Sequence, residues 1–113
     1  MTPTTFENAR QQIAREKLVL LYISMPRCSV CLAVKPRIEK LFAAELVQLQ
    51  LDAAAYPEVA GTYQAMTAPV VLLFFNGKEV HRQARFIDFD KLAHVIGQYQ
   101  AADTAISYED LFQ

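Results

Sequence analysis

Two apolar runs constrain the fold of this chain more than any other feature. "LVLLYIS" covers residues 18–24 and "APVVLLFF" covers residues 68–75. Runs of this length with β-branched and aromatic members are typical of strands buried on both faces. Such strands occur in sheets with helices packed on either side, so the runs predict an α/β domain.

Helical spacing of apolar residues fills the segments between the expected strands. Thr4, followed by Glu7 three residues later, forms a capping-box pattern and predicts a first helix through about Glu16. The segment "SVCLAVKPRIEKLFAAE" predicts a second helix of about 15 residues. A kink is expected at Pro36, because proline has no backbone N–H to donate. The alternating "LVQLQLD" that follows predicts a further strand.

The second half of the chain predicts a hairpin packed against a last helix. A short helix is expected over residues 57–63, since Pro57 suits a helix start. Asn76-Gly77 is a strong hairpin signal and predicts that "KEVHRQAR" pairs antiparallel with the second apolar run. Asp88 caps the last helix. The order α-β-α-β-α-β-β-α thus predicts a central mixed four-stranded sheet with helices on both faces.

Length and charge indicate a single soluble domain. The chain has 113 residues, of which 53% are apolar and 20% charged, and its formal net charge is -1. This charge gives no reason to expect nucleic acid or an anionic membrane as a partner. The N-terminal segment lacks the pattern of a signal peptide, and no run is long enough to span a bilayer. We therefore expect a cytoplasmic protein, monomeric or a weak dimer.

The C-terminal segment is expected to extend beyond the last helix. We divide the chain into a domain over residues 1–102 and an extension over residues 103–113. Ser107 with Asp110 forms a potential cap in this extension. Tyr108, Leu111 and Phe112 are apolar enough to dock, either on this chain or on a partner. A frayed or self-packed terminus is the simpler interpretation.

The only two cysteines, Cys28 and Cys31, form a C-x-x-C pair between the first apolar run and the second helix. Open α/β sheets place their sites at this end of a parallel strand. At a helix N-terminus the backbone N–H groups and the helix dipole favour a thiolate, and Arg27 is placed to assist it. Cys31 lies one turn later, close enough for a disulfide. This predicts Cys28 as nucleophile and Cys31 as the residue that resolves a mixed disulfide.

Two other interpretations of the pair remain open from the residues alone. Both cysteines could simply be small apolar core residues. A zinc site would need about four ligands, and the remaining candidates are His81 and His94. Their positions, one on the hairpin and one on the last helix, do not match a zinc-ligand spacing, so we expect no metal.

The chain resembles the thioredoxin family over about residues 5 to 100. The resemblance rests on the order of elements, the C-x-x-C pair, Pro36 five residues after Cys31, and Asp52 at the end of the next strand. The stretch "TAPVVLLFFNGKEV" adds the family's proline, apolar strand and Asn-Gly turn. The resemblance implies a thioredoxin-like fold and a thiol-disulfide oxidoreductase that acts through a redox-active Cys28–Cys31 disulfide without another cofactor.

The resemblance also implies how substrates bind. Pro69 should be cis and lie near Cys28, which leaves the backbone of Ala68 free to bind an extended substrate. The implied partners are protein disulfides and a thioredoxin-reductase-like or other thiol electron donor. The expected substrate-binding residues are Met25, Pro26, Arg27, Met66, Ala68 and Pro69.

The chain departs from the family pattern close to the cysteines. No tryptophan flanks the pair, so Met25, Pro26 and Met66 would have to supply the apolar wall for substrate docking. Between the cysteines, Ser29 and Val30 stand where the family usually has Gly-Pro, which restores a backbone N–H and adds a hydroxyl donor.

Further departures lie beneath and beside the pair. Tyr22 replaces a buried acid that is thought to assist proton transfer, and Gln48 replaces its lysine partner. The family has a glycine in the substrate groove, and this glycine aligns with about Phe86 of this chain. These departures keep open a second hypothesis, a thioredoxin-fold binding or adaptor module with weak or no redox turnover.

Overall fold

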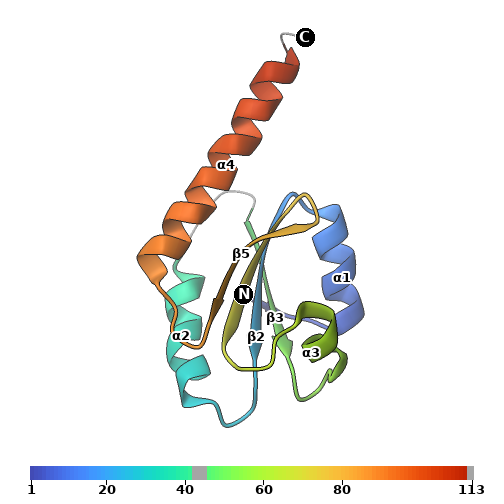
Figure 1. The fold of residues 1–113 in the computed structure, drawn as a ribbon, viewed down its shortest axis with the longest axis vertical. Coiled ribbons are helices and arrows are strands. Elements are labelled where there is room, and N and C mark those ends of the chain that lie inside the picture. The colour runs from blue at the N-terminus through green and yellow to red at the C-terminus, as the bar shows by residue number, and fades with distance from the viewer. Residues whose placement is uncertain (42–45, 112–113) are drawn as a thin grey trace.

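The computed structural model describes residues 1–41 and 46–111, with side chains described up to residue 102. The described chain forms one mixed five-stranded sheet with helices on both faces (Figure 1). The strands are β1 (Thr2–Pro3), β2 (Leu18–Ser24), β3 (Leu46–Asp52), β4 (Val70–Phe75) and β5 (Lys78–Ala84). The helices are α1 (Phe6–Arg15), α2 (Ser29–Glu39), α3 (Glu58–Tyr63) and α4 (Phe89–Leu111).

The sheet has the order β1-β3-β2-β4-β5. β2 pairs parallel with β3 and antiparallel with β4, and β5 completes the predicted hairpin. The predicted α/β class and mixed sheet are confirmed, and the predicted elements follow one another in the expected order, but the predicted count of four strands is wrong. The additional strand is β1, where Thr2 pairs with Leu49 and Pro3 with Gln50.

The central strand β2 is buried on both faces, as its apolar run predicts. Its alternating side chains therefore enter two separate cores. Val19, Leu21 and Ile23 lie in the core with α1 and α3. Leu18, Leu20 and Tyr22 lie in the core with α2 and α4. Figure 1 shows the two helix pairs on opposite sides of the sheet.

The ends of α1 and α2 differ from the sequence prediction. Thr5, not Thr4, caps α1, and its Oγ1 accepts a hydrogen bond from the Asn8 backbone N–H at 3.1 Å. The α2 helix ends at Glu39, so it is shorter than predicted. The last residues of the segment predicted as this helix, 42–45, lie outside the described residues.

The last helix is longer than the sequence predicts. α4 continues to Leu111, so Ser107 lies within it and the prediction of a new cap there is wrong. The division into residues 1–102 and 103–113 falls inside this helix and stays a prediction. The docking predicted for Tyr108, Leu111 and Phe112 concerns side chains that lie outside the described part. No helix in the described ranges is long and apolar enough to cross a membrane.

Candidate active site

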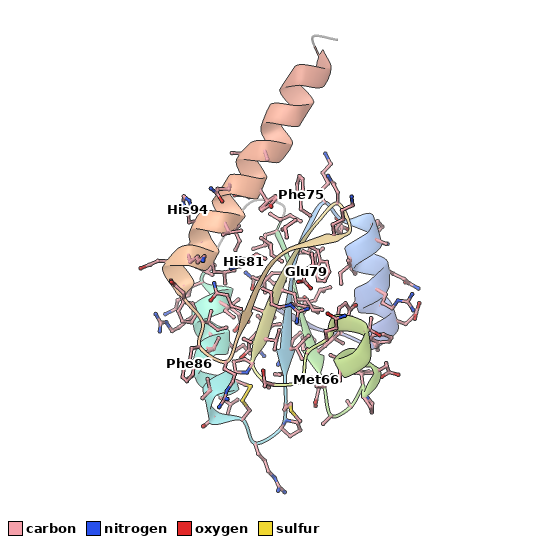
Figure 2. The ribbon with its side chains drawn as sticks, in the orientation of Figure 1. Met66, Phe75, Glu79, His81, Phe86 and His94 are labelled. Carbon is pink, nitrogen blue, oxygen red and sulfur yellow. A yellow bond between two sulfur atoms is a disulfide. The ribbon has the colours of Figure 1, made fainter. Side chains whose placement is uncertain are left out.

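Three loops meet at one end of the sheet because of the strand directions. β2 ends at Ser24 beside the start of antiparallel β4, and β5 ends at Ala84 opposite Val70. The loops after β2, before β4 and after β5 therefore lie side by side. Met66, from the loop before β4, and Phe86, from the loop after β5, are labelled at this end in Figure 2.

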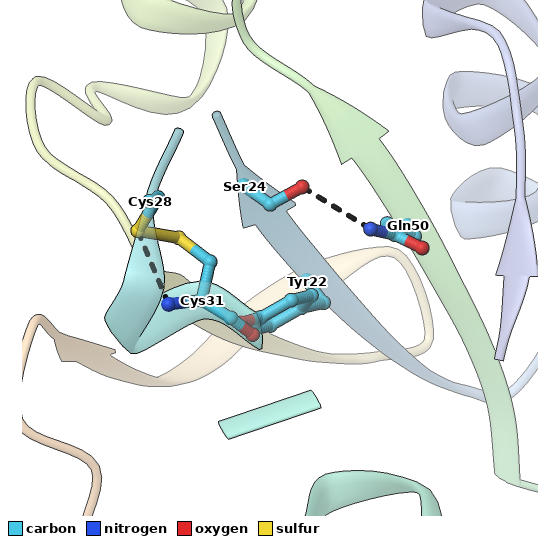
Figure 3. The surroundings of a disulfide bond; sticks show 5 residues. All are labelled: Tyr22, Ser24, Cys28, Cys31 and Gln50. Atoms are coloured by element: carbon cyan, nitrogen blue, oxygen red, sulfur yellow. Dashed lines mark hydrogen bonds between the residues drawn. A yellow bond between two sulfur atoms is a disulfide. The ribbon is translucent and has the colours of Figure 1, made fainter. Parts of the chain in front are cut away.

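Cys28 and Cys31 form a disulfide at this end, with 5.2 Å between their Cα atoms (Figure 3). Cys28 is the N-cap residue of α2, and its Sγ accepts a hydrogen bond from the Cys31 backbone N–H at 3.1 Å. Cys31 is buried, with an exposed fraction of 4%, whereas Cys28 is partly exposed. Of the two cysteines, Cys28 is therefore the more exposed.

Tyr22 lies fully buried beneath the disulfide. Its hydroxyl donates a hydrogen bond to the Cys31 carbonyl oxygen at 2.6 Å. Burial raises the pKa of Tyr22 to about 12, so the hydroxyl stays protonated and acts as a donor at neutral pH. Nearby, the Gln50 amide donates to the Ser24 hydroxyl at 3.2 Å (Figure 3). Tyr22 thus ties the first turn of α2 to the sheet.

A pocket of about 240 Å³ opens beside Cys28. It is lined by Arg27, Cys28, Ser29, Val30, Ala68, Arg85 and Phe86. Of the predicted substrate-binding residues, Arg27 and Ala68 line this pocket. Met25, Pro26 and Met66 do not line it and are exposed on the adjoining loops. The structure thus brings only part of the predicted set to the pocket.

The loop before β4 is tied to the loop after β5. The Ala68–Pro69 peptide bond is cis, and Pro69 is buried. The Pro69 carbonyl accepts a hydrogen bond from the Arg85 backbone N–H at 2.7 Å. This bond holds Arg85 and the residue after it next to the pocket.

Arg85 is a pocket residue that the predicted substrate-binding set missed. Its φ of 67° lies in the left-handed region that favours glycine, whereas Phe86 is not among the positive-φ residues. The left-handed position after β5 is therefore Arg85, one residue before the position that the family pattern indicated. The sequence held no signal that could have located it, because an irregularity in the pairing between Leu73 and Phe74 shifts the hairpin register by one residue, so that Ala84 instead of Gln83 pairs with Val70.

Other residues considered in the sequence lie away from the pocket. Pro36 is exposed within α2. The Gln48 amide donates to the Leu41 carbonyl at 3.1 Å, beyond the far end of α2. His81 contacts Gln83 at 3.0 Å, and burial, together with Lys91, lowers the pKa of His81. No group of three or more potential metal ligands occurs among the described residues.

The family model described as Thioredoxin matches residues 1–98. The chain is 39% identical over 83 residues to the thioredoxin-like protein YdfQ of Bacillus subtilis, an alignment that covers 71% of this chain and 73% of that protein. It is 35% identical over 97 residues to a thioredoxin of Chlamydia trachomatis, covering 83% of this chain and 93% of the relative.

Solved thioredoxin structures share the fold. The oxidised thioredoxin from Plasmodium falciparum has a TM-score of 0.77 at 18% identity, covering 88% of this chain and 97% of that chain. A mutant thioredoxin from Halobacterium salinarum also has a TM-score of 0.77, at 20% identity, covering 87% and 90% of the two chains.

Proposed function

Because the chain belongs to the thioredoxin family and is a thiol-disulfide oxidoreductase, we propose that it exchanges disulfides with Cys28 as nucleophile and Cys31 as resolving cysteine. The observation that carries these roles is the difference in burial. Cys28 caps α2 at the edge of a pocket, whereas Cys31 is 4% exposed beneath it. A bulky substrate disulfide can contact the first sulfur but not the second.

The reaction begins from the reduced protein. The Cys28 thiolate attacks one sulfur of the substrate disulfide, and the other substrate sulfur leaves as a thiolate and takes a proton. Cys31 then loses its proton and attacks Cys28 in the mixed disulfide, which releases the second substrate thiol. Two electrons and two protons pass to the substrate, and the Cys28–Cys31 disulfide forms.

The position of Cys28 supports the nucleophile role. The N–H of Cys31 points at its sulfur, and the N-terminus of α2 carries a partial positive charge, so both stabilise a thiolate. The Tyr22 hydroxyl fixes the Cys31 carbonyl and so holds the first turn in place. Tyr22 is a positioning residue in this proposal.

The remaining parts of the proposal concern the setting of the reaction. Its substrates are protein disulfides, and a thioredoxin-reductase-like or other thiol donor returns the pair to the dithiol form. Disulfides that form in the cytosol are usually transient and catalytic, so the redox role of this pair supports a cytoplasmic location. The cysteine pair is the only redox group that this cycle uses, and the protein acts as a monomer or weak dimer.

A binding module with weak turnover is the second candidate. It is favoured by the surroundings of Cys31, because the side chains that hydrogen-bond beneath the disulfide are Tyr22, Ser24 and Gln50, and none is a carboxylate that could accept the Cys31 proton. A pull-down with Cys31→Ala separates the two candidates. Reductant-sensitive covalent capture supports the oxidoreductase, and partners retained regardless of reductant support the module.

Turnover tests the main proposal. Reduction of insulin by dithiothreitol is followed by turbidity with the wild type, Cys28→Ser and Cys31→Ser. We expect the wild type to accelerate the reaction and Cys28→Ser to remain at the uncatalysed rate. Equal rates for wild type and Cys28→Ser, whether both are fast or both are at background, would contradict the proposal.

A further inference from the structure

We propose that the preferred substrates are protein disulfides in which a cysteine is flanked by carboxylate side chains and an apolar residue. This inference rests on the proposed function and adds the chemical class of the segment that the pocket binds. It is drawn from charge, backbone conformation and exposed apolar surface around Cys28.

Two arginines beside the reacting sulfur have no acidic partner in the described structure. Arg27 and Arg85 line the pocket with Cys28, and the described lining contains no Asp or Glu. By contrast, Arg82 pairs with Glu79 at 2.7 Å. The guanidinium of Arg85 lies 6.0 Å from the centre of the Phe86 ring, an interaction that leaves its positive charge uncompensated. The pocket therefore presents two positive charges to an incoming segment.

The backbone holds both arginines in a conformation that glycine adopts with less strain. Arg27 has a φ of 59° and Arg85 a φ of 67°. The hydrogen bond from the Arg85 N–H to the Pro69 carbonyl helps to maintain the second of these. Strained positions of this kind gather at functional sites. Arg27 and Arg85 are both held at such positions beside Cys28, which supports a role for the two side chains in binding the substrate segment.

Exposed apolar side chains surround the same pocket. Phe86 is 86% exposed and Val30 is 46% exposed, and both line the pocket. Met66 is 78% exposed, and Figure 2 shows it at the same end of the sheet as Phe86. Exposed apolar groups gathered in one place mark an interaction site. A complementary segment carries an apolar side chain together with its carboxylates.

The size of the surface favours a polypeptide over a small disulfide. The pocket volume of about 240 Å³ is below the range of roughly 300–1,000 Å³ typical of small-molecule sites. Met25 and Met66 extend the apolar surface beyond the pocket lining. An extended segment can contact the arginines and these outer side chains together, whereas a small anionic disulfide such as glutathione disulfide would leave the outer ones unused.

The test compares three disulfide-linked peptide dimers that differ only beside the cysteine. Each peptide carries one phenylalanine, and its cysteine is flanked by Glu, Gln or Lys. The pre-reduced protein is mixed with each dimer in stoichiometric amounts at low salt, and reduction is followed after an acid quench. Each rate constant is divided by that for dithiothreitol, because flanking charges alter the reactivity of a disulfide toward any thiolate.

We expect the Glu peptide to react faster than the Gln peptide, and the Lys peptide to react slowest. An exposed charge pair is worth about 1.4- to 5-fold, so two arginines predict a Glu-to-Gln ratio of roughly two to twenty-five. The ratio should fall toward one at about 0.5 M salt, because the Debye length shortens. The double variant Arg27→Gln with Arg85→Gln should bring the Glu-to-Gln ratio close to one. The double variant Arg27→Lys with Arg85→Lys keeps both charges and should retain the ratio.

Arg15→Gln is the matched control. It removes one positive charge, half of what the double arginine variant removes, just before β2 and so at the opposite end of that strand from Cys28; among the described residues Arg15 pairs with partly exposed Glu16 at 3.5 Å. Its Glu-to-Gln ratio should equal that of the wild type. A fall in its ratio by half or more of the logarithmic change seen with the double arginine variant would show that net charge, not the pocket, sets the preference, and would overturn the proposal.

The outcomes also separate this inference from the proposed function. Equal normalised rates for the Glu and Gln peptides in the wild type overturn the substrate class while leaving the oxidoreductase intact. Reduction of none of the peptides by the wild type overturns both. A normalised rate for glutathione disulfide above that of the Glu peptide would assign the arginines to a small anionic disulfide and would also overturn the proposal.

Discussion

Replacing Tyr22 by phenylalanine removes one hydroxyl from beneath the disulfide and keeps the rest of the side chain. Tyr22 is fully buried, and its hydroxyl donates to the Cys31 carbonyl at 2.6 Å. A net hydrogen bond of this kind contributes about 0.5–1.5 kcal/mol. The carbonyl keeps its partner in the helical ladder, so we expect Tyr22→Phe to lower the free energy of unfolding by about 1 kcal/mol at pH 7.

The difference should disappear in alkali. Burial raises the pKa of Tyr22 to about 12, above its usual value of about 10. Between pH 10 and 12 the unfolded chain ionises at this residue and the folded chain does not, so the contribution present below pH 10 is lost as the pH rises. At pH 11 the wild type should have lost about 1.4 kcal/mol through Tyr22, which cancels its advantage over Tyr22→Phe.

Urea unfolding from pH 7 to pH 11 measures both effects. The comparison is made in a Cys28→Ala, Cys31→Ala background, because thiol-disulfide exchange is fast in alkali. The pKa of Tyr63 is also raised, mainly by burial, but Tyr63 is present in both proteins and cancels in the difference. Equal midpoints at pH 7, or a difference that persists unchanged to pH 11, would refute the reasoning about Tyr22.

Three further substitutions test the supporting structure, each measured by urea unfolding at pH 7. Thr5→Ala should cost about 1 kcal/mol through loss of the α1 cap, and Thr4→Ala should cost less; the reverse order would contradict the cap assignment. Arg82→Met should cost about 1–3 kcal/mol, because Arg82 donates to the Gln64 carbonyl at 2.9 Å and also to the Tyr63 carbonyl; an unchanged midpoint would contradict these contacts. Gly77→Ala should cost about 1–2 kcal/mol, since its φ is +81°; a neutral result would contradict this turn conformation.

The fold could be predicted because burial leaves a pattern in the sequence. β2 is apolar at every core position on both faces, and the Asn76-Gly77 turn set the antiparallel hairpin. β1 left no such pattern, because its two residues are exposed and join the sheet through their backbone alone. The length of α4 was missed since its apolar stripe weakens after Tyr99, while no Gly or Pro follows to end the helix.

The cysteine pair could be predicted from its position, but the pocket could not be fully predicted. Cys28 and Cys31 follow a recognisable strand, and their spacing fixes one helical turn between them. Arg85 and Phe86 belong to the pocket only through the loop that follows β5. Exposed side chains on a loop follow no periodicity in the sequence. The positive φ of Arg85 could not be predicted either, because arginine rarely adopts this conformation.

The central claim is that Cys28 attacks and Cys31 resolves, and trapping of the mixed disulfide tests it most directly. Pre-reduced Cys31→Ser and Cys28→Ser are each mixed with insulin, quenched with acid and measured by intact mass spectrometry without reductant. The account predicts one covalent adduct with Cys31→Ser that dithiothreitol reverses, and none with Cys28→Ser. An adduct of equal yield with Cys28→Ser, or no adduct with either variant, would contradict the account.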